Sequence, residues 1–269
     1  DNKGETIEIN LTKIRGVESQ GMICSERELG ISDNHNGIMI LEDNMPVGEE
    51  LAEFLKDWVY EIENKSISHR GDCFSHRGIA RELSAILAIE YLEDDITPES
   101  ILPNGSGKKL NIEISTSKEL CRRFSALLID NIEVKDSPLW LKARLSSVGE
   151  RSINNIVDIT NFVMLDKGQP LHAYDFDKLS GGKLIVRKAK SNERVKTLDG
   201  NDRSLDNTML VIADEKNIED IAGIMGGYNT QISNDTNTIL LEAANFDMYN
   251  IRRTSRQLGL RSEASTRFE

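Results

Sequence analysis

This sequence of 269 residues has few cysteines and shows neither a long apolar run nor the pattern of an export signal. The three cysteines, Cys24, Cys73 and Cys121, are too few and too scattered for a disulfide framework. No uninterrupted apolar run approaches the ~18 residues of a membrane-spanning helix, and no basic-then-apolar segment marks a signal peptide. Together these absences predict a protein of the reducing cytosol. Because the chain does not begin with Met, we expect it to be a piece of a longer protein.

Composition and charge favour a folded chain of about two domains, at ~150 residues per domain. Hydrophobic residues make up 38% of the chain, which is too many for a disordered segment. The net charge of −12 is uneven, since residues 1–110 hold 11 basic and 22 acidic residues whereas residues 111–269 hold 22 and 23. The acidic first part is therefore not a general phosphate-binding surface. Any nucleic-acid contact is expected to be local and to lie in the second part.

The first part of the chain has the pattern of short strands followed by helices. Two strands and two helices are predicted, over residues 6–11, 37–41, 47–58 and 75–91. The strands would belong to a small β-domain, a fragment of a barrel. Ser75 is the expected N-cap of the second helix. The polar stretch 93–107 is rich in helix and strand breakers, which predicts a linker.

The second part of the chain alternates between extended and helical patterns. Strands are predicted over residues 110–114, 124–134, 183–187, 209–213 and 238–242. A helix is predicted over 152–166, with Gly168 placed to cap its C-terminus. This order of elements predicts an α+β domain of about 160 residues.

Three places in the second part are candidates for chemistry. Glu242 interrupts an apolar run, and because a buried carboxylate without partners is costly, a hydrogen-bonding role is expected unless the side chain faces outward. Gly226 and Gly227 indicate a close approach of the backbone, to a neighbouring strand or to a ligand. His172 follows a helix end and a proline, which places it in a loop. A histidine there is either an ordinary surface residue or a residue with a catalytic or binding role.

Two further patterns carry competing interpretations. His69, Cys73 and His76 have a spacing that could hold zinc, but a fourth ligand is missing nearby and an ordered loop before the helix is the simpler interpretation. A run of arginines lies near the end of the chain, at positions 252, 253, 256, 261 and 267. It is either a solvated helix face or a contact to phosphate.

Several segments together resemble one family, the bacterial phenylalanyl-tRNA synthetase β subunits. The segments are residues 16–30, 72–82, 156–161, 168–175, 223–227, 240–244 and 259–269. They occur in the family's order and cover essentially the whole chain. The sequence departs from the family pattern at residues 68–71, which precede the Asp72-Cys73 motif, and at Ser262, where Thr is common.

The resemblance implies an architecture of the α+β class with several domains. Residues 1–48 would be part of a tRNA-binding, OB-like barrel insert. Residues 49–107 would be a small helical domain and linker, and residues 108–269 an editing domain. The location implied is the cytoplasm.

The resemblance also implies an activity. The complete enzyme would be an α2β2 tetramer that uses ATP and Mg²⁺ to attach phenylalanine to tRNA(Phe), with the synthetic site on the α subunit. The β subunit would carry a separate site that hydrolyses tyrosine mistakenly attached to that tRNA. This piece alone is not expected to aminoacylate or to hold a metal. The alternative is a tRNA-binding scaffold module without editing activity.

Seven positions take roles from the resemblance. The implied catalytic residues are His172, Asn161 and Glu242, and the implied substrate-binding residues are Arg151, Gly226, Ser262 and Ala264. Glu242 would meet the tyrosine phenol, while His172 and Asn161 would position the aminoacyl ester or the attacking water.

The four substrate-binding positions would shape the pocket around the ester. Gly226 would let the backbone approach the substrate, and Ser262 with Ala264 would line the pocket. Arg151 would face the end of the tRNA.

Overall fold

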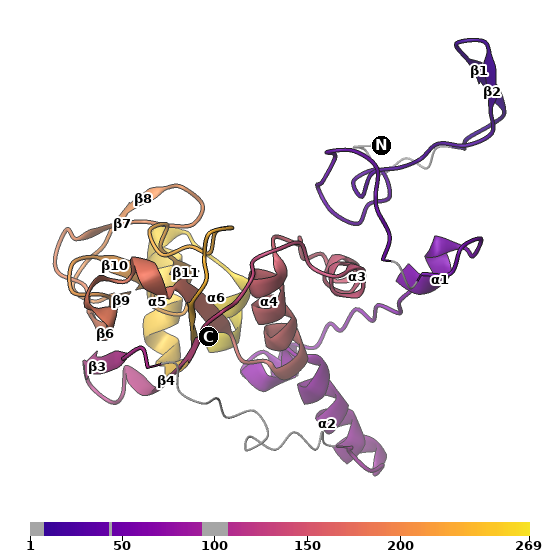
Figure 1. Ribbon diagram of the computed structural model, residues 1–269. Helices are drawn as coiled ribbons and strands as arrows, with labels where there is room; N and C mark the ends of the chain where they lie inside the picture. Colours follow the sequence, from indigo (N-terminus) through magenta and orange to yellow (C-terminus); the bar gives the residue numbers. More distant parts are fainter. Residues whose placement is uncertain (1–7, 43–44, 93–106) are drawn as a thin grey trace. The chain divides into compact units, whose positions relative to one another are not determined.

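The computed structural model describes residues 8–42, 45–92 and 107–269 (Figure 1). The chain forms two compact units: Asp1–Glu61 with Asp136–Ile153, and Ile62–Lys135 with Asn154–Glu269. The predicted domain boundaries after residues 48 and 107 stay a prediction. The predicted linker at 93–107 lies almost entirely outside the described residues. Within the described ranges, no helix is both long and apolar enough to cross a membrane.

The first unit contains little regular structure. Its elements are β1 (Thr12–Ile14), β2 (Val17–Ser19), α1 (Leu51–Leu55) and α3 (Leu139–Ser147). β1 and β2 form an antiparallel hairpin whose turn residues, Arg15 and Gly16, both have positive φ. Lys142 of α3 is buried and its Nζ lies 2.8 Å from Glu26 Oε1, a contact that ties residues distant in sequence together.

Four sequence predictions for this unit need correction or stay open. The predicted strand 37–41 is wrong, because these residues find no strand partner and only the Met39 amide bonds to the Cys24 carbonyl. The described residues of the predicted strand 6–11 also lie outside any strand. The predicted helix 47–58 shrinks to the five residues of α1, none of which is buried. The OB-like barrel stays a prediction.

The second unit begins with helical elements. They are η1 (Lys65–Ile67), η2 (Gly71–Cys73), α2 (His76–Leu87) and α4 (Asn155–Lys167). Ser75 caps α2 as predicted, since its side chain accepts a hydrogen bond from the Gly78 amide at 3.0 Å. The helix ends earlier than predicted because Ala88 adopts a left-handed conformation. The α4 cap at Gly168 is confirmed, with φ of 77°.

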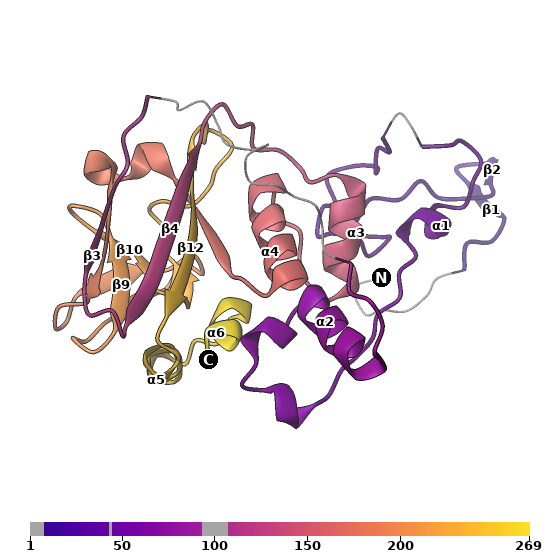
Figure 2. The same ribbon diagram turned by 90° about the horizontal axis from the view of Figure 1, so that it is seen from below.

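Two sheets form the body of the second unit (Figures 1 and 2). The first has the strand order β11-β10-β9-β6-β3, in which β3 and β6 are parallel and the other pairs antiparallel. Its strands are β3 (Asn111–Ser115), β6 (Lys183–Lys188), β9 (Leu210–Ala213), β10 (Ile218–Ile221) and β11 (Met225–Gly226). The second sheet is antiparallel, in the order β4-β12-β5. Its strands are β4 (Cys121–Ile129), β5 (Leu171–Asp175) and β12 (Ile239–Phe246).

Smaller elements complete this unit. They are η4 (Phe176–Lys178), η5 (Ser180–Gly182), β7 (Arg194–Lys196), β8 (Asp202–Ser204), α5 (Met248–Leu258) and α6 (Glu263–Phe268). β7 and β8 pair as a separate antiparallel hairpin. α4 packs against β5 and against α2, and α6 packs against α5 and η2. The mixture of several sheets and helices confirms the predicted α+β class.

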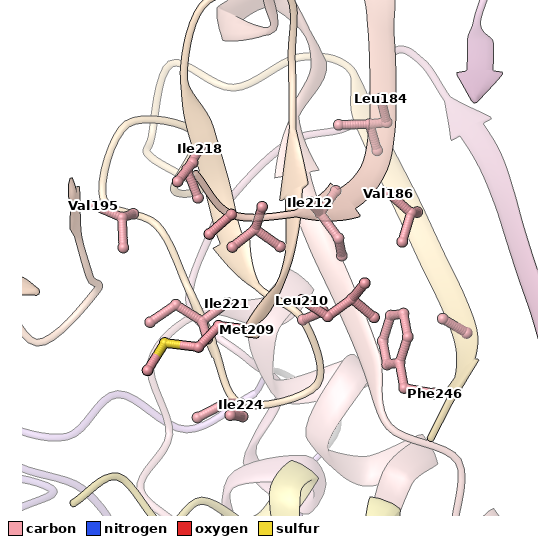
Figure 3. Packing of buried hydrophobic residues seen from close by; sticks show 14 of the residues in the cluster. Leu184, Val186, Val195, Met209, Leu210, Ile212, Ile218, Ile221, Ile224 and Phe246 are labelled. Carbon is pink, nitrogen blue, oxygen red and sulfur yellow. The ribbon is translucent and has the colours of Figure 1, made fainter. Parts of the chain in front are cut away.

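The hydrophobic core takes side chains from both sheets (Figure 3). Along β12, Leu240 and Ala244 are buried, whereas Leu241 and Ala243 between them are only partly buried. This period of two is what a strand with one covered face requires. The strand runs to Phe246, four residues beyond the predicted end, because the alternation continues through the small residues that follow Glu242.

We expect Leu240→Ala to lower the free energy of unfolding of the second unit by about 2–5 kcal/mol, because Leu240 is 0% exposed and its loss leaves a cavity in the core. Urea denaturation followed by fluorescence measures the change. Leu241→Ala is the matched control, with the same atoms removed from the opposite face of the strand. Equal destabilisation by the two variants would contradict the conclusion that Leu240 faces the core and Leu241 the opposite side of β12.

Candidate functional site

Cross-strand pairing brings two of the predicted residues together. β5 and β12 pair so that His172 lies directly opposite Glu242. Tyr174 is two residues further along β5 and therefore shares the face of His172, diagonal to Glu242. The rings of His172 and Tyr174 meet edge to face, with centroids 4.4 Å apart. Glu242 is 5% exposed and Tyr174 is 0% exposed, so the pair faces inward.

A second carboxyl reaches the same point from the other sheet. The Tyr174 hydroxyl lies 2.5 Å from Glu242 Oε2 and 3.2 Å from Oδ2 of Asp220, which belongs to β10. We call these three residues the carboxyl–phenol cluster. A phenol has one proton to donate, so it hydrogen-bonds to both carboxyls only if one of them is protonated and donates to the phenol oxygen.

Burial explains where that second proton resides. It raises the pKa of Glu242 well above the usual range, and the neighbouring Asp220 charge raises it further. Burial also raises the pKa of Asp220 to about 7, although the hydrogen bond from Tyr174 opposes the shift. The pKa of Tyr174 rises for the same reason, so the phenol stays neutral. The raised pKa values of the two carboxyls therefore favour retention of the proton that the two hydrogen bonds of Tyr174 require.

A cavity of about 70 Å³ opens beside the carboxyl–phenol cluster. At roughly 10–15 Å³ per water, it has room for several water molecules. Its lining residues are Pro170, Leu171, His172, Asp220, Gly223, Ile224, Met225, Gly226, Glu242, Phe246, Ala264 and Phe268. Apart from the two carboxyls and His172, these residues present apolar side chains or glycine backbone. The site thus combines polar groups at one place with apolar walls, the usual character of a small-molecule pocket.

Each glycine of the pair 226–227 has a different neighbour. A Cβ at Gly226 would collide with the His172 ring, lying 2.8 Å from Nε2. A Cβ at Gly227 would lie 2.7 Å from the Glu219 carbonyl oxygen on β10. The predicted close approach to a neighbouring strand is therefore confirmed at Gly227, whereas Gly226 lies against the His172 ring and an approach to a ligand stays a prediction.

His172 is held as a neutral imidazole. Burial lowers its pKa to about 4, because a positive charge would be poorly solvated there. A neutral ring donates from one nitrogen and accepts at the other. His172 can therefore orient a water or a carbonyl oxygen, but it is not a cation at neutral pH.

The other predicted site residues lie in different settings. Ala264 of α6 lines the cavity, whereas the Ser262 hydroxyl donates to the Ile224 carbonyl at 2.8 Å and caps α6. Ser262 thus holds a wall of the cavity in place. Asn161 lies half-buried on α4 and is not among the lining residues. Arg151 belongs to the first unit, where it pairs with Asp33 at 3.3 Å.

Sequence reasoning missed Tyr174 and Asp220. Tyr174 could have been found from the strand period, since it is in phase with His172. Asp220 sits in a strand whose four residues are all buried, and the argument applied to Glu242 applies equally to an acid between Ile218 and Ile221.

The competing patterns from the sequence have structural explanations. In the described part of the chain, no group of three or more His, Cys, Asp or Glu side chains could hold a metal. His76 Nδ1 instead lies 3.1 Å from the Leu165 carbonyl oxygen, and Cys73 is buried in η2. Among the arginines, Arg267 bonds to Glu263 at 2.7 Å and Arg253 to the Thr208 carbonyl at 3.0 Å.

Comparison with known proteins places the chain among synthetase sequences. The B3/4 domain family model matches residues 120–269. The phenylalanine–tRNA ligase beta subunit of Dehalococcoides mccartyi is 46% identical over 272 residues, covering 100% of this chain and 33% of that protein. That of Carboxydothermus hydrogenoformans is 46% identical over 266 residues, covering 98% and 33%. The solved structure of an N-terminal fragment of the Pyrococcus horikoshii phenylalanyl-tRNA synthetase beta subunit matches at 14% identity, with a TM-score of 0.40, over 78% of this chain and 67% of that one.

The environment of His172 predicts its titration. We expect its imidazole signals in an NMR pH titration to stay those of the neutral ring from neutral pH down to about 4, because burial opposes the charge. Spectra of His172→Gln identify the resonances that belong to this residue. A midpoint near the ordinary histidine value of about 6.5 would contradict the buried, uncharged state.

Proposed function

The chain belongs to the B3/4 domain family and is part of a phenylalanine–tRNA ligase beta subunit, and on that premise we propose that its second unit hydrolyses tyrosine mistakenly attached to tRNA(Phe). The observation that carries the proposal is the carboxyl–phenol cluster, which faces a cavity with apolar walls. Such a pocket accepts an aromatic ring and offers polar groups to the oxygen that the ring carries.

The selectivity follows from the cost of unpaired polar groups. A hydrophobic pocket built for phenylalanine rejects tyrosine poorly, because the two rings differ only by a hydroxyl. A second site with a buried acceptor separates them well, since the phenylalanine ring leaves that acceptor desolvated and unpaired, at about 1–3 kcal/mol. Glu242, as the resemblance implies, meets the phenol of bound tyrosine.

The reaction needs water held in line with an ester carbonyl. The water oxygen forms a bond to the carbonyl carbon, the carbon–oxygen bond to the tRNA ribose breaks, and the water proton passes to the leaving ribose oxygen. An aminoacyl ester is already activated, so positioning supplies much of the acceleration. Neutral His172, together with Asn161, positions the water or the ester, and Gly226, which lines the cavity, admits the substrate backbone.

The remaining assignments belong to the whole enzyme. The chain spans about one third of the length of the curated relatives it matches. As part of that enzyme it would work in the cytoplasm with tRNA(Phe), an α subunit, ATP and Mg²⁺. Residues 1–48 would contribute an OB-like tRNA-binding insert, Arg151 would face the tRNA end, and Ser262 with Ala264 would complete the pocket.

We expect the 269-residue chain to deacylate Tyr-tRNA(Phe) faster than Phe-tRNA(Phe), and Glu242→Ala to reduce that preference by about tenfold or more, the equivalent of ~1.4 kcal/mol. Single-turnover deacylation of the two purified esters measures both rates. Glu133→Ala is the control, because the Glu133 carboxylate is 80% exposed.

Two results would count against the proposal. Equal rates for both esters in the unmodified chain would favour the alternative, a tRNA-binding scaffold module without editing. If Glu242→Ala still deacylates Tyr-tRNA(Phe) faster than Phe-tRNA(Phe) by the same factor, other residues than Glu242 select the tyrosine ester.

A further inference from the structure

A short strand contact joins the end of β7 to the glycine pair beside the cavity. β7 packs beside β10 (Figure 1), and Thr197, which follows β7, pairs with Gly227 in an antiparallel bridge. The Leu198 amide donates a hydrogen bond to the Gly226 carbonyl at 3.0 Å, so the pairing extends to a residue that lines the cavity. Thr197 is 0% exposed and Leu198 is 42% exposed. Because neighbouring residues of a strand point to opposite sides, Leu198 lies on the solvent side of this contact.

The solvent side of the contact also carries a cation and an aromatic ring. Lys196 is two residues from Leu198 and shares its side, and the Tyr228 amide donates to the Lys196 carbonyl at 2.8 Å. Lys196 Nζ lies 4.5 Å from the centre of the Tyr228 ring, within the range at which an ammonium is attracted to an aromatic face. Tyr228 is 43% exposed, so its ring is held in place and is still accessible. We call Lys196, Leu198 and Tyr228 the aromatic rim.

The aromatic rim adjoins His172. A Cβ at Gly226 would lie 3.1 Å from Leu198 Cδ1 and 2.8 Å from His172 Nε2. The leucine methyl and the imidazole therefore lie against the same glycine, although only the imidazole lines the cavity. A ligand that contacts His172 and extends out of the cavity past Gly226 would meet the rim.

The turn that follows the rim is fixed by side chains. The Thr197 hydroxyl donates to Asp199 Oδ1 at 2.6 Å, and Arg203 Nε donates to the same hydroxyl oxygen at 3.0 Å. Arg203 Nη2 also donates to Asp199 Oδ2. These bonds hold the turn that carries Leu198, so little order is lost when a ligand lies against it.

The charges around the rim favour an anion. Arg194 is two residues before Lys196 and lies on the same side of β7, and Asp202 lies opposite Lys196 on β8. All three side chains are exposed. Two cations and one carboxylate leave this patch with a surplus positive charge, which attracts a phosphate group.

The proposed substrate has a part that lies outside the cavity. In an aminoacyl-tRNA the amino acid is esterified to the ribose of the terminal adenosine. A cavity of about 70 Å³ does not enclose a nucleoside in addition to an amino acid. Nucleobases stack on exposed aromatic side chains, and lysines contact phosphates. The chemistry of the rim is therefore the chemistry that the excluded part of the substrate requires.

We propose that the aromatic rim binds the terminal nucleotide of the aminoacyl-tRNA. The adenine stacks on the Tyr228 ring beside Leu198, and the Lys196 ammonium pairs with the phosphate on the 5′ side of that nucleoside. The proposal rests on the editing function proposed above and adds the binding site for the nucleotide end of its substrate. These residues contact the substrate away from the ester, so they act on its affinity.

A stable analogue of the substrate end tests the proposal without hydrolysis. The probe is 3′-(L-tyrosylamino)-3′-deoxyadenosine, in which an amide replaces the ester, and L-tyrosinamide is the matched ligand without the nucleoside. We expect isothermal titration to show that the 269-residue chain binds the adenosine conjugate at least about tenfold more tightly, the equivalent of ~1.4 kcal/mol. A 5′-phosphate on the conjugate is expected to add affinity that falls as the salt concentration rises.

Three variants assign the added affinity to the rim. Tyr228→Ala is expected to abolish the advantage of the conjugate, while Tyr228→Trp keeps it because an indole also offers a face for stacking. Lys196→Gln is expected to remove the added affinity of the 5′-phosphate and its salt dependence. L-tyrosinamide binding is expected to stay unchanged in all three. Tyr249→Ala is the matched control, since Tyr249 is a 73% exposed tyrosine of α5.

Two outcomes would overturn the proposal. One is equal affinity of the unmodified chain for the conjugate and L-tyrosinamide, including failure of both to bind. The other is a conjugate affinity in Tyr228→Ala that matches that of Tyr249→Ala, which would leave Lys196 and Tyr228 as a surface pair that only stabilises the strand contact. Circular dichroism and thermal unfolding verify that the variants fold, and the two ligands on the unmodified chain decide the matter if one does not.

Failure of the editing function has a different signature. The conjugate would then bind with the expected dependence on Tyr228, while Tyr-tRNA(Phe) would not be hydrolysed by the same chain.

Discussion

A single phenol between two buried carboxyls joins the two sheets of the second unit. Tyr174 and Glu242 come from the three-stranded sheet, and Asp220 comes from β10 of the five-stranded sheet. Each of these groups would be costly to bury alone, and together they provide a hydrogen-bond partner for the phenol and for one oxygen of each carboxyl. Removing one partner from such an arrangement leaves the others unpaired, so the cluster constrains the sequence of three strands at once.

The same constraint shapes the cavity. Because β5 and β12 are held in register, His172 stands opposite Glu242 and its ring meets Tyr174 edge to face. Only a residue without a side chain fits against that ring, which accounts for Gly226. The polar groups therefore converge on one side of the hollow, while the far walls come from apolar residues of the core and of α6. The site is built on rigid strands, a setting that favours precise positioning of a ligand.

Prediction from sequence succeeded where the signal is local. The caps at Ser75 and Gly168, and the strand predicted over 238–242, need only neighbouring residues and were found. The short strand 37–41 failed because a strand exists only when a partner pairs with it, which its own residues do not determine. Glu242 and His172 were identified, but Asp220 was missed because its importance depends on which strands the fold brings together.

The protonation of Glu242 is the central claim and can be measured directly. Isotope-edited infrared spectroscopy, with ¹³C-labelled glutamate side chains, separates the carbonyl stretch of a protonated carboxyl from the bands of carboxylates. At neutral pH we expect the 269-residue chain to show a protonated glutamate band that loses intensity in Glu242→Gln, because burial raises the pKa of this group well above its usual range. Glu219, whose pKa burial raises to about 7, contributes to the band in both proteins. A spectrum at neutral pH that does not change between the two proteins in this region would contradict the account.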